Sequence, residues 1–247
     1  MMNKGPICIE DDNLSVAWKR AFDALMQQGS KEITPLIVSI TGFDHGQPRE
    51  NLRIRDRLDH ALRARGRYDC HTVANTLFPA SLWNPAHPRS ALFNRYLQIW
   101  PSINKYRDNR HGTYFQRLIA FGDCNQLEHV ISIYLANNHR RSALQASIFD
   151  PLQDHTNQRQ RGFPCLQHVS FTPNDQNLTV TGVYATQHIF EKAYGNYLGL
   201  CALGRFMAHE MGLELAKMVC IANVERLGNH GKHDLAALAQ ELSELVN

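Results

Sequence analysis

Residues 178–212 read LTVTGVYATQHIFEKAYGNYLGLCALGRFMAHEMG and carry the clearest structural pattern in the chain. Residues 178–184 combine apolar and β-branched side chains in a short run, which predicts a β-strand. Residues 196–211 are apolar over a length that exceeds an ordinary strand, and this predicts a long buried helix. We therefore expect a strand followed by a long helix at the centre of the fold.

Weaker patterns extend this interpretation along the rest of the chain. Runs rich in β-forming residues predict strands in residues 33–43, 142–149, 166–172 and 217–223. Helical periodicity predicts helices in residues 14–28, 52–64, 91–100, 126–137 and 232–246. Residues 76–89 are rich in proline and aromatic side chains and are expected to form an ordered loop. Because no regular alternation of strand and helix is visible, we predict one α+β domain, residues 1–247, whose mixed or antiparallel sheet is covered by long helices.

The composition favours a cytoplasmic enzyme. Hydrophobic residues make up 43% of the chain, which is enough for a sizeable core. The net charge is only +3 and no block of five basic residues occurs, so a nucleic-acid partner is not indicated. No apolar stretch reaches the ~18 residues that would span a membrane, and residues 1–12 lack the apolar region of a secretory signal.

The six cysteines include no C-x-x-C pair, so we expect neither a zinc site nor a disulfide framework. Cys201 and Cys220 lie in apolar runs, where a cysteine acts as a small buried hydrophobic residue. Cys165 differs from them because it follows Pro164, after a polar loop and at the start of a predicted strand. It is the cysteine to consider as a nucleophile, although a cysteine in a strand is usually part of the core.

Three features in a fixed order resemble the thymidylate synthase family. They are the adjacent arginines Arg140 and Arg141, the Pro-Cys of RGFPCLQHVSFTP (residues 161–173), and Asn196 near the start of the long helix. GTYFQRLIAFG (residues 112–122) and NQLEHVISIYLANNHRR (residues 125–141) extend the resemblance upstream. It covers roughly residues 112–223 and rests on ordered spacing rather than on long identities.

The resemblance implies a thymidylate synthase-like fold that dimerises through its sheet, and a transferase that adds a methyl or hydroxymethyl group to C5 of a pyrimidine nucleotide. Cys165 would add to C6 of the ring, and 5,10-methylenetetrahydrofolate would be the cofactor. Arg140 and Arg141 would reach the phosphate site of the partner subunit in a homodimer. Asn196 would hydrogen-bond the amide edge of the pyrimidine, since an amide both donates and accepts. Arginines near a thiol also favour its thiolate form.

Three further positions are candidates by the same resemblance. Arg49 in the segment QPRE would supply the phosphate arginine from the subunit's own early loop, although a surface arginine is the alternative. The Arg-Ser phosphate pair of the family falls on Ala185 and Thr186, which leaves Thr186 as a substrate contact. The aspartate that holds the folate falls on His188, which would bind a pterin or would be an ordinary histidine at a strand end.

Other positions depart from the family pattern. Leu166 and Ser170 stand where the family has His and Gln, and Arg226 and Gly228 lie near its sugar-binding His and Tyr. No glutamate occurs in residues 51–127, where the family keeps the acid that organises proton transfer.

These departures imply a divergent relative, akin to the pyrimidine C5-methylases and hydroxymethylases of this fold. Glu50 or Asp123 would be the replacement acid. Two alternatives stay open. One is a same-fold enzyme that acts on a pyrimidine in DNA or in a natural-product precursor, and the other is a non-catalytic nucleotide-binding paralogue.

Overall fold

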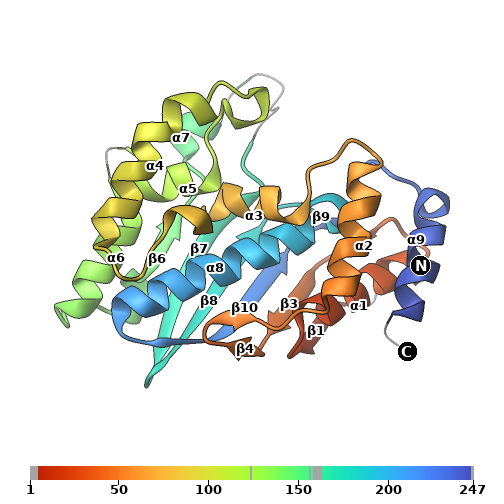
Figure 1. Ribbon diagram of the computed structural model, residues 1–247, viewed down its shortest axis with the longest axis horizontal. Coiled ribbons are helices and arrows are strands. Elements are labelled where there is room, and N and C mark those ends of the chain that lie inside the picture. Colours follow the sequence, from red (N-terminus) through yellow and green to blue (C-terminus); the bar gives the residue numbers. More distant parts are fainter. Residues whose placement is uncertain (1–4, 123, 156, 158–162, 246–247) are drawn as a thin grey trace.

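The computed structural model describes residues 5–122, 124–155, 157 and 163–245. Helices cross one main β-sheet, and both ends of the described chain lie at the same side of the molecule, near α9 (Figure 1). The strands are β1 (Ile7–Asp11), β2 (Glu32–Ile33), β3 (Leu36–Ile40), β4 (Phe43–Asp44), β5 (Gln47–Pro48), β6 (Gln145–Ser147), β7 (Leu166–Asn174), β8 (Asn177–Tyr184), β9 (Gln187–His188), β10 (Glu214–Ala222) and β11 (Glu225–Arg226). The α-helices are α1 (Leu14–Gln27), α2 (Leu52–Arg63), α3 (Cys70–Leu77), α4 (Arg89–Ile103), α5 (Tyr114–Ile119), α6 (Gln126–Leu135), α7 (Pro151–Asp154), α8 (Tyr194–Met211) and α9 (Lys232–Glu244).

The main sheet is mixed, which confirms the predicted α+β class. Its strands lie in the order β1-β3-β10-β8-β7-β6. β1 runs parallel to β3, and β10 runs parallel to β8. β10 is antiparallel to β3, and β7 is antiparallel to both β8 and β6. Because β7 and β8 are antiparallel, the start of β7 and the end of β8 lie side by side at the same end of these strands.

One face of the sheet forms the core beneath α1 and α8. Val38, Cys220, Gly182 and Val169 lie opposite one another across four strands, and all four are buried. Since side chains alternate between the faces of a strand, each neighbouring residue points to the other side. The apolar half of each strand thus packs on the helices, and α8 crosses the sheet as the central helix (Figure 1).

The opposite face of the sheet carries a second, partly exposed apolar row. Ile37, Ile221 and Val183 lie opposite one another on β3, β10 and β8, and each is only partly buried. His168 extends this row on β7. We call this side of the sheet the open face. Its branched apolar side chains are partly exposed to water, and such a face is suited to packing against another surface.

Two glycines let α3 lie directly on α8. A Cβ atom at Gly195 would come within 2.5 Å of the Val73 Cβ, and one at Gly199 would come within 2.9 Å of the Leu77 Cβ. Because real Cβ atoms do not approach this closely, any larger residue would push the helices apart. The close contact holds α3 over the first turns of α8, where Asn196 lies.

The structure corrects several predicted boundaries. The expected loop 76–89 begins inside α3, which starts where the Asp59 carboxylate accepts the Cys70 N–H and Asp69 accepts the Thr72 N–H. The strand predicted over 142–149 is confined to β6, because a 3₁₀ turn occupies Arg141–Ala143. β1 was not predicted. In the described part of the chain, no helix is long and apolar enough to cross a membrane.

Candidate functional site

A cavity of about 820 Å³ lies where α3, α4, the start of β7 and the start of α8 meet. Four of the residues predicted from the sequence line it, namely Cys165, Thr186, His188 and Asn196. They come together because Cys165 precedes β7, Thr186 and His188 follow β8, and β7 and β8 are neighbours in the sheet. A cavity of this size lies within the range of small-molecule sites.

Cys165 lies on the cavity wall, and its side chain is exposed there as a free thiol. The protein around the cavity limits the hydration of the sulfur, and this burial raises the pKa of the Cys165 thiol, while the positive charge of Lys192 lowers it. Tyr114 packs beside the same turn. Burial raises the pKa of Tyr114, although the backbone amides of Leu166 and Cys165 act in the opposite direction. Tyr114 is therefore a neutral phenol near neutral pH that holds the backbone of the cysteine turn.

Asn196 presents an unpaired amide to the cavity. It lies in the first turn of α8, is 4% exposed, and lines the cavity wall. No hydrogen bond joins its side chain to any other residue that the structure describes. Because this amide faces the cavity, a ligand there that offers both a donor and an acceptor would pair with it.

His188 is held at the cavity wall beside a buried carboxylate. Its Nδ1 atom lies 3.8 Å from Oε2 of Glu191, and Glu191 is 8% exposed. Burial lowers the pKa of His188, and the Glu191 charge acts against this. A mainly neutral imidazole near pH 7 offers one donor and one acceptor to a ligand. Thr186, two residues earlier, adds a hydroxyl to the same wall.

The three arginines predicted as phosphate contacts lie outside this cavity. Arg49 follows the β4–β5 hairpin, where its Nε atom lies 3.2 Å from Asp44 and its Nη1 atom lies 3.3 Å from Asp12. Arg140 and Arg141 are exposed at the turn before β6. Within one chain, therefore, none of these three guanidinium groups lines the cavity that contains Cys165.

The candidate acids also lie elsewhere. Glu50 accepts a hydrogen bond from the Tyr194 hydroxyl at 2.7 Å and pairs with Arg55 at 3.1 Å. These contacts hold Glu50 in the packing between α1, α2 and α8 rather than in the cavity. Asp123 lies outside the described residues.

Several cavity residues were not predicted from the sequence. Tyr68, Tyr106, Asp108 and Lys192 line the cavity, and the charge of Lys192 acts on Cys165. Lys192 belongs to η4 (Ile189–Ala193), a single π-helical turn that precedes α8. Such turns occur often at functional sites, but nothing in the letters IFEKA indicates one.

Arg117 also lines the cavity, but buried partners occupy it. Its two terminal nitrogens lie 2.7 and 2.8 Å from the Asp154 carboxylate, and they donate to the backbone carbonyls of Ile148 and His111. A buried arginine with this many partners anchors the loops around it. Its role here is to fix the cavity wall.

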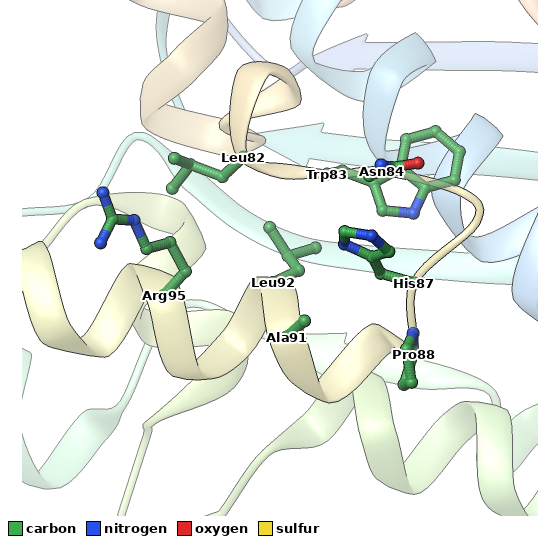
Figure 2. Close-up of a pocket in the computed structure, with 8 residues that line it drawn as sticks. All are labelled: Leu82, Trp83, Asn84, His87, Pro88, Ala91, Leu92 and Arg95. Atoms are coloured by element: carbon green, nitrogen blue, oxygen red, sulfur yellow. The ribbon is translucent and has the colours of Figure 1, made fainter.

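A second, smaller pocket of about 210 Å³ lies between α4 and the loop that precedes it (Figure 2). Trp83 and His87 line one end, and Arg95 lines the other. It contains none of the residues predicted from the sequence, so the larger cavity is the candidate site. No group of three metal-binding side chains is found in the part of the chain that the structure describes.

Known proteins do not extend this assignment. No model of a known protein family matches the chain, and no curated protein matches it. The interpretation of the cavity therefore rests on its own residues and their chemistry.

Proposed function

We propose that this protein transfers a methyl or hydroxymethyl group to C5 of a pyrimidine nucleotide. The observation that carries the proposal is the placement of the Cys165 thiol and the unpaired Asn196 amide in one cavity. A thiol serves as a nucleophile, and the amide matches the donor and acceptor pattern of a pyrimidine edge. Four of the seven predicted site residues line this single cavity, which further supports the proposal.

The first step is addition of the Cys165 thiolate to C6 of the ring. The new S–C6 bond uses the sulfur lone pair, and the electrons of the C5–C6 double bond move to the C4 carbonyl as an enolate. Asn196 would hydrogen-bond the pyrimidine amide edge, where this negative charge develops. The addition makes C5 nucleophilic.

The second step forms a bond at C5 and then releases the enzyme. C5 takes up an electrophile, loses its original proton to a base, and expels the Cys165 thiolate as the C5–C6 double bond reforms. Without a one-carbon donor, C5 takes up a proton from the solvent in place of the electrophile. The side chains of Thr186 and His188 supply polar groups, and Ile103 and Tyr106 supply apolar surface on the same cavity.

These residues fit a reduced folate, because a pterin needs both hydrogen bonds and a flat apolar contact. When bound, 5,10-methylenetetrahydrofolate would supply the one-carbon unit at the oxidation level of formaldehyde, so that water would complete a hydroxymethyl product, whereas a methyl product would also need a hydride from the tetrahydrofolate. His188 and Thr186 would hold it by hydrogen bonds.

We further propose a thymidylate synthase-like homodimer formed through the open face of the sheet. The half-exposed row of Ile37, Ile221 and Val183 supports a second copy as the occupant, because it would bury a continuous branched apolar surface. Arg140 and Arg141 precede the edge strand β6 of the same sheet, from which they would serve the partner's cavity. The six free cysteines fit a reducing, cytoplasmic setting.

Release of tritium from C5-labelled nucleotides tests the proposed function. We expect the protein to release tritium from at least one of dUMP, dCMP, UMP and CMP without folate, because thiolate addition alone activates C5. Labelled single-stranded DNA and free pyrimidine bases complete the set of substrates. Release of tritium from DNA alone would mean that the substrate is a pyrimidine in a polymer. Tight nucleotide binding without release from any substrate would contradict an enzyme and favour a nucleotide-binding protein.

A further inference from the structure

The π-helical turn η4 sends two adjacent charged side chains to different places. Glu191 turns inward, where its carboxylate lies 3.2 Å from His230, 3.4 Å from Arg67 and 3.8 Å from His188. Lys192 instead projects into the cavity that contains Cys165. Adjacent residues of a helical turn point about 100° apart, which accounts for this divergence.

Lys192 is held in the cavity by its surroundings. Its ammonium group lies 5.6 Å from the centre of the Tyr68 ring. The Tyr68 hydroxyl donates to Asp108 at 3.1 Å, and the Asp108 carboxylate attracts Lys192. Lys192 is exposed to the cavity, and the aromatic face and the carboxylate favour a position of its ammonium group beside them.

Lys192 is the cavity cation that remains available to Cys165. Arg117 and Lys192 are the lysine and arginine side chains on the described cavity wall, and Arg117 is fully engaged by Asp154 and two carbonyls. The charge of Lys192 lowers the pKa of the Cys165 thiol, in opposition to burial. The reciprocal effect also holds, since Cys165 favours the charged form of Lys192.

We propose that Lys192 is the electrostatic partner of Cys165, and that its ammonium group favours the thiolate form needed for attack, against the burial that favours the neutral thiol. The use of that thiolate in catalysis rests on the proposed pyrimidine chemistry, whereas the pairing of the two charges does not. Lys192 thus takes over, within one chain, the activating role that the sequence resemblance gives to arginines.

The other charges around the pair set its behaviour with pH. Tyr114 and Tyr184 face the sulfur, and burial raises the pKa of both, so they stay neutral near pH 7. Burial lowers the pKa of Lys192, Glu191 and Asp108 raise it, and Arg67 lowers it. Burial and the charge of Lys192 disfavour protonation of His188, which is therefore mainly neutral near pH 7. Lys192 therefore carries the positive charge whose removal would change the electrostatic potential at the Cys165 sulfur.

The rate of alkylation of Cys165 by iodoacetamide, measured from pH 5.5 to pH 10, tests this pairing. Peptide mass spectrometry separates Cys165 from the exposed Cys8 and Cys124. The variants are Lys192→Met, Lys192→Gln and Lys192→Arg, with Lys105→Met as the control for a change in net charge. Lys105 is exposed on the loop after α4 and does not line the cavity.

We expect Lys192→Met and Lys192→Gln to slow the alkylation of Cys165 about 3- to 10-fold at pH 7, because the thiolate fraction falls about tenfold for each unit by which the pKa rises. The midpoint of the pH profile moves upward by the corresponding amount. Lys192→Arg keeps most of the wild-type rate, and Lys105→Met keeps all of it. Continued protection of the buried Cys70, Cys201 and Cys220 from alkylation shows that each variant is folded.

A Cys165 profile that is the same in Lys192→Met, Lys192→Gln and wild-type protein would overturn the pairing. So would a Lys192→Arg variant that loses as much reactivity as the methionine variant. No nucleotide takes part in this measurement. A failure of the tritium assay would therefore contradict the pyrimidine chemistry and leave the Lys192–Cys165 pair standing.

Discussion

Replacing Cys165 with serine is expected to reduce tritium release from C5 by about 10⁴-fold or more, because loss of an enzyme's nucleophile removes the covalent route altogether. Serine occupies nearly the same space, but its hydroxyl does not ionise near neutral pH. The cavity, including the Asn196 amide, is left in place. The same labelled nucleotides used for the wild-type protein measure the loss.

Cys124→Ser is the matched control for this variant. Cys124 is also an exposed free cysteine, but it lies between α5 and α6 and does not line the cavity. Its replacement is expected to leave tritium release unchanged. Release by Cys165→Ser at the wild-type rate would show that the exchange does not pass through the sulfur.

Glu225→Gln is expected to make the protein more stable above pH 6 and to flatten the dependence of stability on pH. Glu225 is 0% exposed, and neither of its carboxylate oxygens has a hydrogen-bond partner in the described part of the chain. Burial raises the pKa of this carboxyl well above its ordinary value. The folded protein therefore keeps Glu225 protonated, while the unfolded chain ionises it above about pH 4.3.

The direction of the pH effect follows from this difference in proton binding. Above the ordinary pKa the unfolded chain holds fewer protons than the folded protein, so the free energy of unfolding falls by about 1.4 kcal/mol for each pH unit until the folded-state pKa is reached. The stabilising contribution of the neutral acid is complete below about pH 4.3 and is lost as the pH rises. Glutamine is neutral throughout and removes this loss.

Urea unfolding at pH 5, 6, 7 and 8 checks this prediction. Glu214→Gln is the control, because Glu214 is an exposed glutamate at the start of β10. The gain from Glu225→Gln is expected to grow with pH, whereas the control changes little. A Glu225→Gln variant that is destabilised equally at every pH would mean that the carboxylate has a partner that glutamine cannot replace.

The sequence predicted the central elements of the fold because their patterns are long and uniform. The helix expected over residues 196–211 appears as α8, and the strand expected over 178–184 agrees with β8 to within one residue. α3 was missed because CHTVANTL mixes β-branched and polar residues, and its start depends on hydrogen bonds that the Asp59 and Asp69 carboxylates accept. A contact such as that of Asp59, 11 residues earlier in the chain, leaves no local pattern in the sequence.

The candidate site was predictable to the extent that its residues belong to neighbouring elements. Cys165, Thr186, His188 and Asn196 meet because β7, β8 and α8 are adjacent in space. Lys192 was missed because its direction depends on a π turn, which the sequence does not display. In the proposed homodimer, the positions of Arg140 and Arg141 relative to the partner's cavity would depend on the other chain, so neither the sequence nor one subunit determines them.

Intact-mass spectrometry with 5-fluoropyrimidine nucleotides tests the central claim most directly. Fluorine at C5 cannot leave as a proton does, so the reaction stops while the nucleotide is still attached to the sulfur. We predict that 5-fluoro-dUMP or 5-fluoro-CMP, with 5,10-methylenetetrahydrofolate, adds the mass of nucleotide and cofactor to the peptide that contains Cys165. A folded protein whose Cys165 reacts with iodoacetamide but forms no adduct with either nucleotide would contradict the proposed chemistry.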